Sequence, residues 1–299
     1  SLGMFGNRIN SYTYNTQTPV YNMMFNIKYL LQTDVSIAPS ENLYDYKFTT
    51  SDGKTNVYES KYFLPISFAV NENTELWDTT EGNPFDVQND FFELATGFSG
   101  VFKEVKYLDT KYDNVSGDKI SKNGTYWFSK YDADSSYAYA DITITPVKNG
   151  NIYLYVNSPD ISSIDISSTK LGSHTQNIDE PYILDCGYYE VGEELKLSID
   201  CGSADVEECY ADIFAYTVDD EILKTGYERL NKNSLNVTKH SNTRIEGTIS
   251  VSENSYLYSS IPYDEGWSIY IDGEKADTFK IGTAMLGTSI KQGEHTVEY

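Results

Sequence analysis

Three aromatic residues and a carboxylate near the end of this 299-residue chain have side chains suited to binding sugars. Tyr263, Asp264, Trp267 and Tyr270 fall within one short segment. An aromatic ring stacks on the C–H face of a pyranose, and a carboxylate accepts the hydrogens of its hydroxyl groups. The competing interpretation is structural, because Trp267 alternates with two isoleucines as the buried face of a strand would. The alternation favours the core for Trp267, and the four residues stand as the candidate glycan-binding set.

Carboxylates are abundant, but no pair of them is marked out for catalysis. A glycosidase needs two carboxyl groups facing each other across a sugar, about 5–10 Å apart. With 45 Asp and Glu residues in the chain, many pairs qualify and their spacing selects none. The chain also lacks Gly-x-Ser-x-Gly and His-Glu-x-x-His motifs. We therefore assign no catalytic residue and interpret the acids as solvated surface charge.

The metal-binding patterns are incomplete. Asp132-Ala133-Asp134 begins like a calcium loop, but the sixth position is Tyr137 instead of Gly and the twelfth is Thr143 instead of Glu. This excludes an EF-hand and leaves a looser calcium site open, while no metal ligand is assigned. The three Cys and three His do not have the spacing of a zinc site. One internal disulfide is compatible with the sequence, and Cys201 with Cys209 closes the shortest loop.

The charge balance excludes several partners. The 22 basic and 45 acidic residues give a net charge of −23, which opposes binding to nucleic acid and to anionic lipid. Lys and Arg form no cluster that offsets it. A polyanionic polymer such as teichoic acid would be repelled unless divalent cations bridge the two. We expect no nucleic-acid partner.

The last part of the chain predicts a β-hairpin. Ile269 and Ile271 flank Tyr270 with the period of a half-buried strand. Asp272-Gly273 supplies the positive φ angles of a type I′ turn, and a return strand begins at Glu274. Gly266 permits a sharp bend before Trp267. These signals are local and independent of any family.

The rest of the chain predicts a mainly β protein, an antiparallel β-sandwich of jelly-roll type with a small α/β N-terminal layer. Residues 1–123 form the mixed α/β region, with a short helix at 19–25, a strand at 27–31 and a helix after residue 84 that ends at Gly97 or Gly100. Residues 124–299 form the sandwich region, with a helix near 221–231 and a C-terminal hairpin within 257–299. Its expected strands include 138–146, 151–156, 163–167, 183–186, 195–200 and 211–218, and the turn 148–150 joins the first two.

The sequence resembles the YfhO-like family of bacterial multipass membrane proteins. The resemblance spans nearly the whole chain in family order and is most specific at the Pro-Tyr-Asp-x-Gly-Trp element, Pro262–Trp267. Its other carriers are Phe25–Leu31, Val57–Pro65, Asn83–Phe85, Gln88-Asn89, Glu221–Lys224, Ile245–Ile249, Ile269–Lys275, Ala284–Gly287 and Gly293–Val297. The apolar runs of this chain are far shorter than the about 20 residues that cross a bilayer, and no signal peptide is visible. The resemblance thus implies a soluble piece of a longer parent, with both termini directed toward transmembrane helices of that parent.

The resemblance further implies a parent similar to polyprenyl-phosphate-sugar-dependent glycosyltransferases that glycosylate lipoteichoic acid in Gram-positive bacteria. The catalytic carboxylate of that class lies on a loop between early membrane helices, outside this chain. We therefore expect a non-catalytic accessory domain on the extracytoplasmic face of the cell membrane, which presents or orients an acceptor glycan or teichoic acid polymer. A free-standing carbohydrate-binding module or adhesin is the alternative, and a secreted glycoside hydrolase is the third hypothesis.

Overall fold

The chain folds into two compact units. The computed structural model describes residues 2–4, 14, 18–33, 45–105, 108–120, 124–204 and 207–299. Within them the protein is mainly β with antiparallel sheets, which confirms the predicted fold class. We call Ser1–Leu2 with Pro19–Val101 and Asp219–Tyr299 the composite unit, and Gly3–Thr18 with Phe102–Val218 the sandwich unit.

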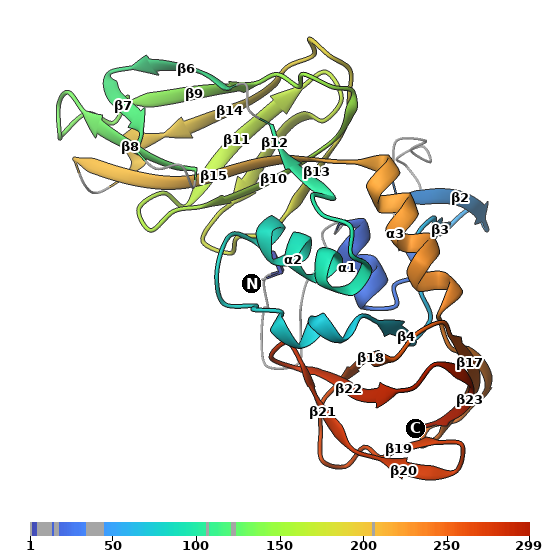
Figure 1. Ribbon diagram of the computed structural model, residues 1–299. Coiled ribbons are helices and arrows are strands. Elements are labelled where there is room, and N and C mark those ends of the chain that lie inside the picture. The colour runs from blue at the N-terminus through green and yellow to red at the C-terminus, as the bar shows by residue number, and fades with distance from the viewer. Residues whose placement is uncertain are drawn as a thin grey trace. The chain divides into compact units, whose positions relative to one another are not determined.

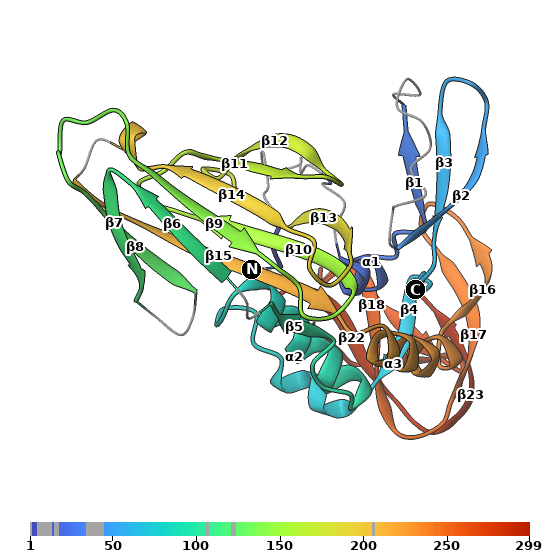
Figure 2. The same ribbon diagram turned by 90° about the horizontal axis from the view of Figure 1, so that it is seen from above.

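The sandwich unit consists of two sheets that enclose one core (Figures 1 and 2). One sheet has the order β13-β10-β15-β8-β7, with β5 also paired to β15, and the other has the order β12-β11-β14-β9-β6. The elements are β5 (Phe102–Glu104), β6 (Leu108–Asp113), β7 (Val115–Lys119), β8 (Thr125–Lys130), β9 (Tyr139–Ile144), β10 (Gly150–Asn157), β11 (Ser163–Ser168), β12 (Gly172–Asn177), β13 (Leu184–Tyr189), β14 (Leu195–Asp200), the 3-10 turn η2 (Cys201–Ser203) and β15 (Glu208–Val218).

Alternation of apolar and polar residues places the strands of this unit. In β14, Leu195, Leu197 and Ile199 are buried in the core while the residues between them are more exposed. The strands predicted at 138–146 and 151–156 are present as β9 and β10. They belong to opposite sheets, so the turn between them crosses the sandwich instead of closing a hairpin.

The three cysteines are buried free thiols, so the disulfide that the sequence allowed is not formed. Cys201 and Cys209 are nevertheless neighbours. Cys201 donates a hydrogen bond to the Cys209 sulfur, and this bond together with burial raises the pKa of the Cys201 thiol. Burial also raises the pKa of Cys186. The thiols therefore serve as small core side chains.

Asp185 on β13 lies where its charged form is disfavoured. Its Oδ1 accepts hydrogen bonds from Asn151 Nδ2 at 2.7 Å and from the Gly187 N–H at 2.9 Å. Burial nevertheless raises the pKa of the Asp185 carboxyl from 3.8 to about 6. In the described part of the chain, the Oδ1 atom of Asn151 is buried without a hydrogen-bond donor.

We expect Asp185→Asn to stabilise the sandwich unit above pH 6. The pKa of the Asp185 carboxyl is higher in the folded than in the unfolded protein. The free energy of unfolding of the wild type therefore falls as the pH rises from about 4 through 6, whereas the amide of the variant does not titrate. Two pKa units correspond to about 3 kcal/mol, which residual solvent contact reduces to about 1–2 kcal/mol. Urea unfolding near pH 4 and near pH 8 measures the gain, which should appear only at the higher pH. An equal gain at both would show that charge is not its cause.

The composite unit is assembled from both ends of the chain. Its elements are α1 (Pro19–Met24), β1 (Tyr29–Gln32), β2 (Tyr46–Ser51), β3 (Asn56–Ser60), β4 (Ser67–Val70), the 3-10 helix η1 (Glu72–Leu76), α2 (Pro84–Thr96), α3 (Asp220–Lys232), β16 (Asn236–His240), β17 (Ile245–Val251), β18 (Ser255–Pro262), β19 (Ile269–Ile271), β20 (Glu274–Ala276), β21 (Thr278–Ile281), β22 (Met285–Ile290) and β23 (Gly293–Glu298). Their sheets have the orders β1-β3-β2, β16-β17-β23-β19-β20 and β21-β22-β18-β4. The last two share one apolar core.

The boundaries of the composite unit follow from strand pairing between segments that are far apart in the sequence. Strand β4 pairs with β18, so that Ala69 lies opposite Leu257. The division of the chain therefore comes at Val101 and Asp219, and the boundary that the sequence suggested at residues 123 and 124 falls inside the sandwich unit. Helices α2 and α3 occur where the sequence placed them. Asn83 caps α2 and Gly97, with φ of 77°, ends it.

Candidate functional site

A hydroxyl-rich face of the sheet β16-β17-β23-β19-β20 forms the candidate site. In β17, Ile249 and Val251 are buried while Thr248 and Ser250 are exposed. Register with β23 places Thr296 opposite Thr248 and Glu294 opposite Ser250. Residues directly opposite on antiparallel strands point to the same face. Two short strands thus bring hydroxyl and carboxylate groups together on the exposed face.

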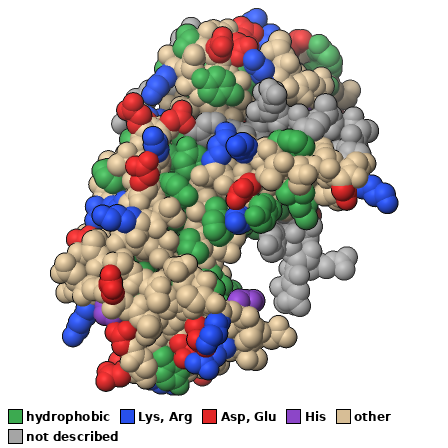
Figure 3. All heavy atoms as spheres, turned by 90° about the vertical axis from the view of Figure 1, so that its right-hand side faces the viewer, with side chains coloured by type: hydrophobic (Ala, Val, Ile, Leu, Met, Phe, Trp, Pro, Cys, Tyr) green, Lys and Arg blue, Asp and Glu red, His purple; other side chains and the backbone are tan. Residues whose placement is uncertain are grey.

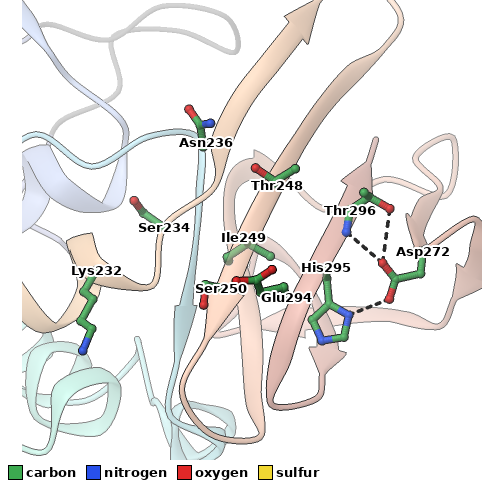
Figure 4. A pocket seen from close by; sticks show the side chains of 10 residues that line it. All are labelled: Lys232, Ser234, Asn236, Thr248, Ile249, Ser250, Asp272, Glu294, His295 and Thr296. Carbon is green, nitrogen blue, oxygen red and sulfur yellow. Dashed lines mark hydrogen bonds and ion pairs between the residues drawn. The ribbon is translucent and has the colours of Figure 1, made fainter.

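These side chains line an open groove of about 630 Å³, which we call the C-terminal groove (Figure 4). It runs from the end of α3 across β16, β17 and β23 to the turn between β19 and β20. Its lining is Lys232, Ser234, Asn236, Thr248, Ile249, Ser250, Asp272, Glu294, His295 and Thr296. Apart from Ile249, every lining side chain carries a hydrogen-bonding group.

Asp272 closes one end of the groove. It occupies the first position of the Asp-Gly turn with φ of 54°, followed by Gly273 at 84°, which confirms the predicted hairpin between β19 and β20. One carboxylate oxygen, Oδ2, lies 2.7 Å from His295 Nδ1. The other accepts the Thr296 N–H at 2.9 Å and the Thr296 hydroxyl at 3.3 Å. The hydrogen bond from His295 is the largest cause that lowers the pKa of Asp272, so this end of the groove carries an ionised, oriented acid.

A smaller hollow of about 260 Å³ adjoins the groove and shares Thr248 and Thr296 with it. Its lining includes Tyr270, Glu246 and Glu298. Both glutamates are paired with cations: Arg244 Nε lies 2.9 Å from Glu246 Oε1 and its Nη2 lies 2.6 Å from Glu298 Oε2. The pairing leaves the hollow less acidic than its residue types suggest.

The structure separates the four residues of the predicted glycan-binding set. Tyr270 is 36% exposed and lines the hollow beside the C-terminal groove. Trp267 and Tyr263 pack against the core that the two sheets share, as the strand alternation favoured for Trp267. Asp264 accepts the Gly266 N–H at 2.7 Å and so shapes the turn before the hairpin. The Trp267 N–H donates to the Asp264 carbonyl at 3.1 Å, so the chain bends at Gly266, which does so without a positive φ.

No sequence motif marked the residues of the C-terminal groove as a binding site. Thr248 and Thr296 are ordinary strand residues far apart in the chain. His295 is far in sequence from the other two histidines. Its hydrogen bond to Asp272 is what makes it part of the site. The register between β17 and β23 brings these residues together, and that register could not be predicted from the sequence.

The calcium pattern forms a turn. The Asp134 N–H donates to Asp132 Oδ1 at 3.1 Å, and the Ser135 N–H donates to the Asp132 carbonyl at 3.0 Å. Within the described ranges, no group of three or more His, Cys, Asp or Glu side chains is arranged to hold a metal ion.

The surface charges are mixed in sign. On the face drawn in Figure 3, Lys and Arg side chains are dispersed among acidic ones and do not gather into a broad basic patch. Of the helices that the structure describes, none has the length and hydrophobicity needed to cross a bilayer.

The solved structures that match this chain resemble it only weakly. A cycloisomaltooligosaccharide glucanotransferase from Paenibacillus sp., solved with cycloisomaltoheptaose, is 8% identical with a TM-score of 0.24, and the match covers 72% of this chain and 49% of that one. HutD from Pseudomonas fluorescens is 7% identical with a TM-score of 0.17, covering 64% and 97%. An arabinose-bound α-L-arabinofuranosidase is 10% identical with a TM-score of 0.21, covering 56% and 30%. At these scores the similarities carry no functional argument.

No curated protein matches the chain. The match to the glucanotransferase spans about half of that enzyme's length. A family model described as bacterial membrane protein YfhO, in contrast, matches residues 1–299, the full sequence. The chain belongs to the YfhO family of bacterial membrane proteins.

Proposed function

We propose that this chain is the extracytoplasmic, glycan-handling part of a membrane-embedded glycosyltransferase-like protein. The parent would use a polyprenyl-phosphate sugar to glycosylate lipoteichoic acid or a related envelope polymer. The chain itself would hold and orient the acceptor, and the catalytic loop and transmembrane helices would belong to other parts of the parent. Membership in a family of membrane proteins supports this setting.

The observation that carries the proposal is the composition of the C-terminal groove. Sugars present hydroxyl groups that both donate and accept hydrogen bonds, so a surface that holds them needs both kinds of partner. Thr248 and Ser250 supply both, Thr296 supplies an acceptor because its hydroxyl donates to Asp272, Asp272 supplies an oriented acceptor, and Lys232 supplies a donor. A volume of about 630 Å³ lies in the ordinary range of ligand sites. An open groove lined mainly by polar side chains favours weak binding, which suits an acceptor that must be released.

The expected partner is an acceptor polymer held by hydroxyl contacts. We expect the double variant Thr248→Val with Thr296→Val to weaken binding of immobilised lipoteichoic acid about tenfold, because two hydroxyl hydrogen bonds of about 0.5–1.5 kcal/mol each are lost. Valine keeps the β-branched shape and both positions are exposed, so the fold should be retained. Biolayer interferometry with the purified chain measures the change.

Thr175→Val is the matched control, since Thr175 is an exposed strand threonine of the sandwich unit. It should bind as the wild type does. Because lipoteichoic acid and this chain are both anionic, wild-type binding should also strengthen when magnesium is added at constant ionic strength. Equal binding by the groove variant and the wild type, or no binding with magnesium present, would refute the assigned role of the groove.

A further inference from the structure

A second candidate site lies in the sandwich unit, on the outer face of the sheet β13-β10-β15-β8-β7. Strand β15 runs between β10 and β8 (Figure 1), and buried residues alternate with more exposed ones from Glu208 to Ala215. Cys209, Ala211 and Ile213 point into the core. Tyr210 and Phe214 therefore point outward, away from that core.

Strand register brings aromatic rings together on this face in two pairs. Tyr210 lies directly opposite Trp127 of β8, and Phe214 lies directly opposite Tyr155 of β10. The rings of Tyr155 and Phe214 are 6.3 Å apart between centroids, with 33° between their planes. Phe214 follows Tyr210 by four positions along the strand, which corresponds to about 13 Å. We call these four side chains the aromatic face.

Polar residues lie beside the two aromatic pairs. Asp212 lies between Tyr210 and Phe214 on β15 and accepts the Thr125 hydroxyl at 2.6 Å. Asp118 of β7 stands opposite Trp127 on the other side. A carboxylate thus lies next to each aromatic pair in the sheet.

The aromatic face is accessible and is held in place. Tyr210 is 38% exposed, and Trp127, Tyr155 and Phe214 are half-buried. The Tyr210 N–H donates to Asp160 Oδ2 at 3.0 Å, and its carbonyl accepts the Ser158 hydroxyl at 2.6 Å. These two bonds hold the backbone that carries the Tyr210 ring, so this part of the strand loses little freedom when a ligand binds.

Charge selects among the ligands that stack on aromatic rings. The outward positions described on β7, β8, β10 and β15 include Asp118, Asp212 and Glu208 but no Lys or Arg. Nucleic acid and phosphate polymers need cations beside the rings, so this surface disfavours them. An uncharged sugar chain needs only ring faces and hydrogen-bond acceptors, and the aromatic face offers both.

We propose that the aromatic face binds a neutral oligosaccharide. Sugar rings would stack on Trp127 and Tyr210, while Asp118 and Asp212 accept hydrogens from their hydroxyl groups. The distance to the Tyr155–Phe214 pair favours a chain of several sugars over a single one. This site belongs to the sandwich unit and does not depend on the C-terminal groove of the composite unit.

The test uses the purified chain with cellohexaose, maltoheptaose and chitohexaose as neutral probes. Calorimetry and tryptophan fluorescence should detect binding of at least one of them. Trp127→Ala and Tyr210→Ala should each weaken it about tenfold or more, as removal of a central aromatic contact does. Tyr137→Ala is the control, because Tyr137 is 54% exposed in a loop outside the aromatic face. It should leave the affinity unchanged.

Tyr210→Ala and the groove variant remove two ambiguities from the test. Tyr210→Ala removes an exposed ring, so it tests the site even if Trp127→Ala fails to fold. The groove variant Thr248→Val with Thr296→Val should bind the neutral probe normally, which separates this proposal from the function proposed for the groove. The proposal is overturned if none of the three probes binds, or if the variants bind as the wild type does. Self-association that Trp127→Ala abolishes, seen by sedimentation, would assign the face to a second copy of the chain instead.

Discussion

Replacing Tyr299 with alanine is expected to lower the free energy of unfolding of the composite unit by about 3–5 kcal/mol. Tyr299 follows β23 and is 5% exposed in the core between two sheets. Its hydroxyl lies 2.7 Å from Ser67 Oγ on β4 and 2.7 Å from Ser259 Oγ on β18. Alanine would remove a ring from the core and also leave two buried serine hydroxyls without this shared partner. Urea unfolding followed by circular dichroism measures the loss.

Tyr299→Phe separates the two contributions, because it keeps the ring and removes only the hydroxyl. It should cost about 1–2 kcal/mol. Burial raises the pKa of Tyr299 to about 12, so the wild-type residue contributes fully below about pH 10 and loses that contribution as the pH rises through 12. The phenylalanine variant should lack this part of the alkaline transition. A loss below about 1 kcal/mol for Tyr299→Ala would mean that the end of β23 does not hold the two sheets together.

Substitution of Gly226 is expected to have the second largest effect. Gly226 lies on α3 where it meets Phe92 of α2, and a Cβ atom there would overlap the Phe92 ring. Phe92 is fully buried, so the ring has little room to move. Alanine normally stabilises a helix interior by about 1 kcal/mol relative to glycine. Here we expect Gly226→Ala to destabilise the composite unit by about 1–3 kcal/mol, and Gly226→Val to destabilise it more.

A double-mutant cycle tests the cause. Phe92→Leu shortens the side chain that Gly226 faces, so Gly226→Ala should cost less in that background than in the wild type. Thr225→Ala is the matched control, since Thr225 is the exposed neighbour on the same helix. It should change stability by no more than about 0.5 kcal/mol. Strictly additive effects of the Phe92 and Gly226 substitutions would show that helix contact is not the reason for the glycine.

Elements with strong local signals were predictable from the sequence. Asn83 and Gly97 mark the two ends of α2, and Asp272-Gly273 marks the hairpin. Each signal works within a few residues, because capping groups and positive φ angles are local requirements. The strands of the sandwich followed from alternation in the same way.

Long-range pairing was not predictable in this way. The composite unit exists because β4 pairs with β18, and no local feature of Ser67–Val70 specifies that partner. The turn between β9 and β10 has the residues of a tight turn, yet it connects opposite sheets. Turn chemistry fixes where a chain bends, whereas the partner of each strand depends on the whole fold.

The candidate site shows the same limit. Aromatic type alone marked Tyr263, Trp267 and Tyr270, but two of these rings were needed for packing and only Tyr270 lies beside the C-terminal groove. The sequence did not predict Thr248 and Thr296 as site residues, because threonine is common in strands. They form the centre of the groove through register alone.

The most direct test of the proposed function measures glycosylation of the envelope polymer in cells that express the full-length parent protein. Cells carrying Thr248→Val with Thr296→Val should show several-fold fewer sugar substituents on lipoteichoic acid than wild-type cells, at equal amounts of parent protein in the membrane. Cells carrying Thr175→Val should match the wild type. An unchanged sugar content in the groove variant would contradict the proposal that the C-terminal groove presents the acceptor.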